Sequence, residues 1–148
     1  MKIVMGSDHV GYPLKMKLKT FIESMGHETE DIGTYSTDRA DYPEYGRKAA
    51  LHVVSNKADR AVLVCGTGFG ISLAANKVPG IRCVNCSDPY TAQLSRLHND
   101  SNAISLGARV IGEELAKMIL KLWLEAGFEG GRHVARLQKL ENFNDADE

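Results

Sequence analysis

The sequence predicts one doubly wound α/β domain built on a parallel β-sheet. Short apolar runs alternate along the chain with segments of helical periodicity, which is the pattern of βαβ units. All of these runs but the second are too apolar for a sheet with one face in water, and they suit strands covered on both faces. A chain of 148 residues can bury one core, and no repeat or linker divides it.

Five strands and three of the helices follow from these patterns and from the breaker residues between them. The strands are expected over residues 2–6, 27–32, 60–64, 81–86 and 102–107. A first helix begins at Pro13, carries one apolar stripe and ends at Gly26. A second helix runs from about Pro43 to Val54. A third follows a glycine-rich loop and ends at about Lys77.

The second half of the chain contains three more helix signals. Asp88 and Pro89 are typical of an N-cap followed by a first-turn proline, and this helix should run to about Leu97. A longer helix is expected over residues 113–126, with Leu115, Ile119, Leu122 and Trp123 on its inner face. Glycines then break the chain before a last helix that begins near Arg132. The acidic tail from about residue 142 is expected to fray.

Charge and hydropathy exclude several classes of partner. The chain has 18 basic and 19 acidic residues, a formal charge of -1, and no long basic run, so a nucleic-acid partner is not expected. No apolar run approaches the roughly 20 residues that span a bilayer, so no membrane partner is expected either. The N-terminus MKIVMGSDH is typical of a strand rather than a signal peptide. A cytoplasmic location is therefore expected.

Three cysteines, an odd number, argue against a disulfide framework. Cys83 and Cys86 form a CxxC motif, but the motif lies inside a predicted strand. A spacing of three places the two side chains on opposite faces of that strand, where they cannot readily bind one metal ion. Both are expected to be small buried core residues.

The stretch VLVCGTGFGIS, residues 62–72, joins a strand to a glycine-rich turn. In open parallel sheets, ligands bind beyond the carboxyl ends of the strands. Ile71 stands where a dinucleotide fingerprint needs glycine and where a Cys-x5-Arg phosphatase loop needs arginine, and the Walker A signature is absent. The glycines would still let successive N–H groups approach an anion. The alternative is a tight turn that only packs closely.

Cys65 stands at the mouth of this turn. Converging N–H groups and a helix N-terminus favour a thiolate, so this thiol could act as a base or nucleophile near neutral pH. A small buried hydrophobe at a strand end is the alternative, and the position alone does not decide between them.

Six separated motifs then agree in order and spacing with one known family. They are GSDHVGYPLK near the start, DYP at 41–43, CGTGFGISLAANKVPGIR at 65–82, SRLHND at 95–100, GARVIG at 107–112 and GGRHVARL at 130–137. Along nearly its whole length the chain resembles ribose-5-phosphate isomerase type B, in the family shared with the galactose-6-phosphate isomerase subunits. The resemblance implies a Rossmann-like three-layer sandwich with a five-stranded parallel sheet. It also implies a homodimer or tetramer whose active sites are shared between subunits, with no metal or other cofactor.

The resemblance assigns roles in converting ribose 5-phosphate to ribulose 5-phosphate through an enediolate. Cys65 is the base that moves a proton between C2 and C1, and Thr67 hydrogen-bonds the reacting oxygens. The amides of Gly66, Gly68, Phe69 and Gly70 would stabilise the enediolate, as a preorganised set of donors can. His98 is the acid and base of furanose ring opening. Asn99 and Asp8 hold the sugar, and Tyr42 lines the pocket.

The resemblance assigns the phosphate group to His9, Arg132 and Arg136, with Arg109 close by. Arg132 and Arg136 are four apart, so on a helix they share one face and can bind one phosphate. Without the family context such a pair is more often a solvated face. His133 is adjacent but is expected to project elsewhere, and it receives no role.

Alternatives stay open at this level. A galactose 6-phosphate isomerase is disfavoured because the chain combines His98 with Arg132 and Arg136, while allose 6-phosphate remains possible as a second substrate. A non-catalytic phosphate-binding module would make Cys65 incidental. A thiol redox protein would use Cys83 and Cys86 instead.

Overall fold

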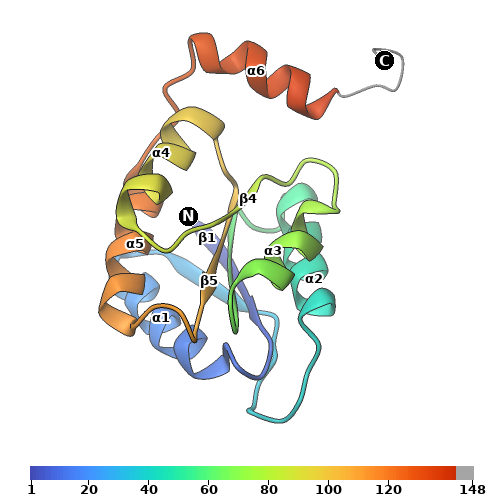
Figure 1. The fold of residues 1–148 in the computed structure, drawn as a ribbon, viewed down its shortest axis with the longest axis vertical. Coiled ribbons are helices and arrows are strands. Elements are labelled where there is room, and N and C mark those ends of the chain that lie inside the picture. Colours follow the sequence, from blue (N-terminus) through green and yellow to red (C-terminus); the bar gives the residue numbers. More distant parts are fainter. Residues whose placement is uncertain (143–148) are drawn as a thin grey trace.

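The computed structural model describes residues 1–142 as three layers, with a parallel sheet between two layers of helices (Figure 1). The sheet contains β1 (Lys2–Ser7), β2 (Glu28–Asp31), β3 (Arg60–Cys65), β4 (Cys83–Asn85) and β5 (Ala103–Gly107). All neighbours pair in parallel, in the order β2-β1-β3-β5-β4. The predicted fold class and all five strands are confirmed. The tail beyond residue 142, expected to fray, lies outside the described residues.

The helices divide between the two faces of the sheet (Figure 1). α1 (Tyr12–Ser24), α4 (Pro89–Asn99) and α5 (Glu113–Glu125) cover one face. α2 (Tyr42–Val54) and α3 (Phe69–Asn76) cover the other. α6 (Arg132–Glu141) lies beyond one end of the sheet and packs on α4. Within residues 1–142, no helix combines the length and the apolar character needed to cross a bilayer.

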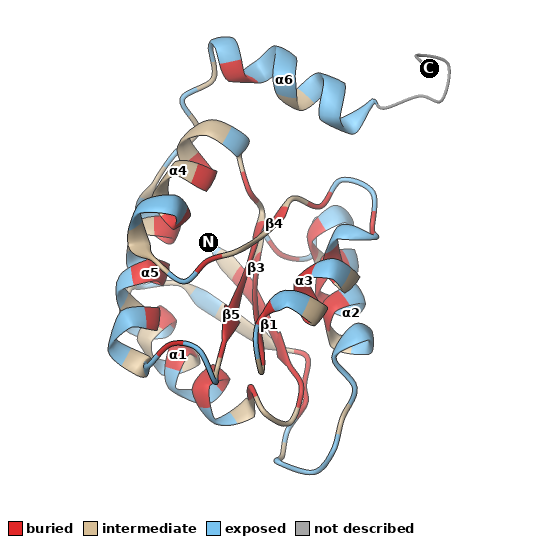
Figure 2. Ribbon diagram, in the orientation of Figure 1, coloured by how far each residue is buried: buried red, intermediate tan, exposed pale blue. Residues whose placement is uncertain are grey.

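The strands fill both cores because successive side chains point to opposite faces. In β1, Ile3 belongs to the core under α1 and α5, whereas Val4 belongs to the core under α2 and α3. The inner strands are therefore buried along nearly their whole length (Figure 2). Cys83 and Cys86 fall into different cores, which confirms that they occupy opposite faces of the sheet.

The structure bears on two predictions about the helices, the N-cap of α4 and the buried face of α5. The predicted N-cap of α4 is confirmed, because Asp88 Oδ1 accepts a hydrogen bond from the Thr91 amide at 2.7 Å. The predicted inner face of α5 is partly wrong, since Leu115 is 36% exposed. The buried residues of that helix are Ala116, Ile119, Leu120, Trp123 and Leu124. The small Ala116 lies on the core side because it is one turn before Leu120, and Leu115 is rotated toward solvent.

The strand order places a topological switch point at the carboxyl edge of the sheet, the edge where all five strands end. β1 is followed by α1 on one face, and its neighbour β3 is followed by α3 on the other face. The loops after β1 and β3 therefore diverge, and ligands of such sheets bind where adjacent loops part in this way.

Candidate functional site

Cys65 is the last residue of β3 and is only 3% exposed. The amide of Gly68 donates a hydrogen bond to Cys65 Sγ at 3.2 Å, and the amide of Phe69 donates to Thr67 Oγ1, also at 3.2 Å. A donor at the sulfur stabilises negative charge that develops there. The loop thus holds the thiol and the hydroxyl together through its own backbone.

Other amides of the loop remain available to a ligand. Among the residues that the structure describes, the N–H groups of Gly66, Thr67 and Gly70 have no acceptor. They stand where α3 begins, and the N-terminal amides of a helix attract anions. The loop can therefore offer backbone donors to an oxyanion. Two of the four amides that the resemblance assigned to this role, those of Gly68 and Phe69, are instead bonded to Cys65 Sγ and Thr67 Oγ1.

Glycine is required in this loop by backbone conformation and by close contacts. Gly68 has φ of +83°, and a Cβ there would lie 2.0 Å from Asn85 Nδ2. A Cβ on Gly70 would lie 2.6 Å from Cζ of Tyr42. The Tyr42 ring therefore packs directly on the loop.

Three further predicted residues come to the same carboxyl edge. Asp8 is buried, and its Oδ1 accepts a hydrogen bond from the Gly11 amide at 2.8 Å. His9 follows it, with Nδ1 3.1 Å from the carbonyl oxygen of Ala40. Arg109 donates its amide to the Gly66 carbonyl at 3.0 Å, and its side chain is exposed beside the loop. These residues, Tyr42 and Cys65 form one half of the predicted site.

His98 and Asn99 lie at the opposite edge of the sheet. They are the last two residues of α4, a helix that runs back from the carboxyl edge of the sheet. Four residues after Asn99 the chain reaches Ala103, where β5 begins. Ala103 pairs with Ala61 at the beginning of β3, whereas Cys65 pairs with Gly107 at the other end of β5. From Ala61 to Cys65 is four residues, or about 13 Å of strand. One chain thus keeps His98 and Cys65 apart by the length of its sheet.

The predicted arginine pair joins His98 at this amino edge. Arg132 and Arg136 are exposed on successive turns of α6, which packs on α4. The structure therefore assembles the predicted residues as two groups, with His98, Asn99, Arg132 and Arg136 apart from the glycine loop.

His133 contradicts the expectation that it projects elsewhere. Its side chain is buried at 5% exposure, and its ring stacks on that of His98 with centroids 4.5 Å apart and 17° between the planes. The helical pattern of α6 contained a signal, because His133, Leu137 and Leu140 fall on one stripe of the helix. His133 turns inward because it occupies the packed side of α6.

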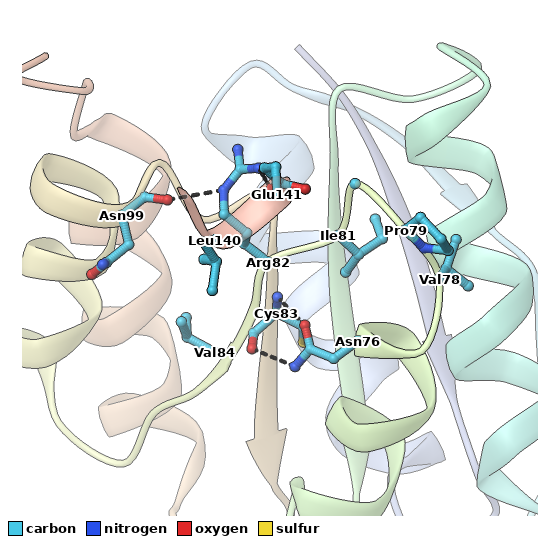
Figure 3. A pocket seen from close by; sticks show the side chains of 11 residues that line it. Asn76, Val78, Pro79, Ile81, Arg82, Cys83, Val84, Asn99, Leu140 and Glu141 are labelled. Carbon is cyan, nitrogen blue, oxygen red and sulfur yellow. Dashed lines mark hydrogen bonds and ion pairs between the residues drawn. The ribbon is translucent and has the colours of Figure 1, made fainter. Parts of the chain in front are cut away.

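Two arginines that received no role in the sequence analysis hold the end of α4. Arg82 Nε donates to the Asn99 carbonyl at 3.0 Å, as Figure 3 shows. Arg96 is buried, and its Nη1 donates to the Ser101 carbonyl at 2.5 Å. These bonds fix the backbone around His98. Both arginines lie inside motifs quoted for the family resemblance, Arg82 at the end of residues 65–82 and Arg96 within residues 95–100. Their acceptors are carbonyl oxygens brought near by the tertiary fold, so the sequence did not indicate their role.

A cavity of about 510 Å³ opens between β4 and α6 (Figure 3). Its walls are Asn76, residues 78–84, Asn99, Leu140 and Glu141, and an Arg82–Glu141 ion pair lies beside it. Of the predicted site residues only Asn99 lines it. The cavity belongs to the amino edge and lies apart from the Cys65 loop.

The described residues contain one group with the composition of a metal site. Ligand atoms of His98, Glu129 and His133 all lie within 4.8 Å of one another. The two imidazole rings stack nearly parallel, however, so an ion in the plane of one ring would lie out of the plane of the other. Histidine binds metals through in-plane nitrogen lone pairs, so this arrangement favours stacking over shared coordination.

The remaining cysteines match their expected core role. Burial raises the pKa of both Cys83 and Cys86 to about 11, so the thiols are protonated at neutral pH. All three cysteines are free, and the opposed positions of these two leave no shared site. The thiol redox alternative has no support in this geometry.

Known proteins match nearly the whole chain. The Ribose/Galactose Isomerase family model matches residues 3–140. Ribose-5-phosphate isomerase B of Escherichia coli is 52% identical over 139 residues, which cover 94% of this chain and 93% of that protein. A ribose-5-phosphate isomerase B structure from Clostridium thermocellum superposes with a TM-score of 0.96, 47% identity and full coverage of both chains. A ribose 5-phosphate isomerase structure from Thermotoga maritima has a TM-score of 0.92 and 45% identity, over 95% of this chain and 97% of that one.

Proposed function

The chain belongs to the ribose/galactose isomerase family, and we propose how its residues interconvert ribose 5-phosphate and ribulose 5-phosphate. The reaction class and the substrate pair come from isomerase relatives that match over nearly the full length of the chain. The observation that carries the chemistry is the Cys65 thiol at a loop of backbone donors. That pairing supplies a base and an oxyanion site side by side.

Ring opening comes first, because only the open aldose has an acidic C–H beside a carbonyl. His98 moves the proton between the ring oxygen and the anomeric hydroxyl, and histidine suits this step because it titrates near neutral pH. Asn99, next to it at the end of α4, holds the sugar. Asp8 binds sugar hydroxyls with the carboxylate oxygen that does not accept the Gly11 amide.

Proton transfer then takes place at Cys65. The thiolate takes the C2 proton of the open aldose, the C2 electron pair forms the enediolate, and the carbonyl oxygen takes the negative charge. The Thr67 hydroxyl and the free amides at Gly66 and Gly70 stabilise that charge. The thiol returns the proton to C1, the O2 hydroxyl proton passes to the O1 oxyanion, and the C2 carbonyl of the ketose forms. A positioned base contributes about 10²–10⁴-fold to such a step.

The phosphate is bound from two directions. His9 and Arg109 approach it from the carboxyl edge that holds Cys65. Arg132 and Arg136, one turn apart on an exposed helix face, bind it from the partner subunit. Arginine suits this role because its planar fork matches two phosphate oxygens.

The active unit is a homodimer in which each site combines two chains. The separation of Cys65 from His98 across the sheet supports this, since one substrate cannot touch both within a single chain. Phe69 and Leu73 on α3 are 62% and 66% exposed beside the glycine loop. An apolar surface next to a catalytic loop is typical of an interface, and a tetramer could pair two such dimers.

The reaction requires no metal or other cofactor in this scheme, since the thiol, the histidine and the amides supply every proton and charge. A cytoplasmic location is part of the same proposal. Free thiols at all three cysteines suit a reducing compartment.

The decisive experiment is isomerisation of ribose 5-phosphate in EDTA, with allose 6-phosphate and galactose 6-phosphate run in parallel. We expect metal-independent turnover that is fastest with the pentose, and loss of that turnover in Cys65→Ala with the sugar phosphate still bound. Faster turnover of a hexose phosphate would reassign the substrate. Binding without turnover in the wild-type protein would instead support a non-catalytic module.

A further inference from the structure

We propose that the flat ring of His133 positions the imidazole of His98 for ring opening, which makes His133 a positioning residue of the isomerase reaction. The inference rests on the proposed role of His98. His133 is buried, whereas its neighbours in sequence, Arg132 and Val134, both face outward.

Stacking is the contact that orients His98. Its ring is half-buried at the last turn of α4. Within residues 1–142 neither ring nitrogen has a hydrogen-bond partner, although one nitrogen lies within 4.8 Å of ligand atoms of Glu129 and His133. The His133 ring lies 4.5 Å away and nearly parallel. Phe128 lies beside His133, with centroids 6.5 Å apart. One face of the His98 ring is therefore held by α6, and no hydrogen bond from the described residues to its nitrogens competes with the substrate.

The neighbours of His133 favour a neutral ring. Burial, and then the positive charges of Arg132 and His98, lower the pKa of His133, against an opposing effect of Glu129. His133 Nε2 is buried without a hydrogen-bond partner among the described residues, and the Glu129 carboxylate lies 3.5 Å from it. A neutral aromatic face can stack under an imidazolium, whereas two imidazolium rings would repel. His98 can therefore take up a proton while it remains stacked.

The test compares three variants of the intact protein. His133→Ala removes the flat face, His133→Phe keeps it and eliminates the unpaired nitrogen, and Val134→Ala is a control at the next, exposed position. Two rates are measured: conversion of ribose 5-phosphate, and exchange of the C1 hydrogens of ribulose 5-phosphate for deuterium in D₂O. The second rate needs no ring step, because phosphorylation of O5 prevents ribulose 5-phosphate from closing a furanose ring.

We expect His133→Ala to lower kcat/KM for ribose 5-phosphate about 10–100-fold, the loss typical of a misplaced catalytic group. His133→Phe should retain most of the turnover, and both variants should exchange the C1 hydrogens at the wild-type rate. Val134→Ala should match the wild-type protein in both assays. Thermal unfolding verifies that each variant is folded. If His133→Ala does not fold, His133→Leu, which fills the space without a flat face, is measured with the same expected loss.

Three results would overturn the inference. They are full turnover of ribose 5-phosphate in His133→Ala, equal losses of turnover in His133→Ala and His133→Phe, or a fall in the C1 exchange rate of His133→Ala as large as its fall in turnover. Failure of the proposed function gives a different result. In that case the wild-type protein would neither convert ribose 5-phosphate nor exchange the C1 hydrogens.

Discussion

Mixing two inactive variants tests whether each active site combines two chains. Cys65→Ala and His98→Ala should each lose turnover, because the base and the ring-opening group are separated by about 13 Å of strand in one chain. In a freely exchanged equal mixture about half of the dimers are mixed, and each mixed dimer contains one site with both residues intact. Turnover should therefore recover to about a quarter of the wild-type value.

The assay is ribose 5-phosphate conversion after co-incubation of differently tagged variants, with mixed dimers measured by a two-step affinity purification. The matched control mixes Cys65→Ala with the Cys65→Ala/His98→Ala double variant, in which no site can be complete. No recovery in the first mixture, with mixed dimers demonstrated, would refute the shared site. Recovery in the control, where no chain contains Cys65, would refute the assignment of Cys65 as the base.

Three further perturbations probe the loop, the CxxC motif and α6. Gly68→Ala should lower the free energy of unfolding by at least about 1–2 kcal/mol, the cost of a left-handed backbone outside glycine. Denaturant unfolding measures this, with Gly112→Ala, where a Cβ meets nothing within 4 Å, as its control. A Cys83→Ser/Cys86→Ser variant should keep its isomerase turnover; loss of activity in folded protein would revive a role for these thiols. The lowered pKa of His133 means that the unfolded chain binds its proton first, so the free energy of unfolding should fall as the pH drops below 6.5. On acidification the melting temperature of His133→Phe should fall less than that of the wild-type protein. An equal fall would show that a group other than His133 causes the pH dependence.

The local patterns of the sequence were sufficient for the elements of this fold. Helix boundaries followed from Pro13, Asp88 and the glycines because caps and breakers act within one turn of the residue that carries them. The Cys65 loop was recognisable for the same reason, since a strand, a nest of glycines and a helix start are contiguous. Leu115 was misplaced because rotation of a helix about its axis depends on the side chains that it meets.

The sequence by itself determined the parallel α/β class, the glycine loop with its thiol, and the family motifs. The tertiary structure alone decided that Arg132, His133 and Arg136 join His98, because α6 follows no strand whose direction would place it. A helix between parallel strands returns the chain to the edge where the strands begin, so α4 carries His98 away from Cys65. The stack of His133 on His98 joins residues 35 positions apart (98 to 133), and it exists only because α6 packs on α4. Side chains from separate helices meet through packing, and packing is not encoded in any single stretch of the chain.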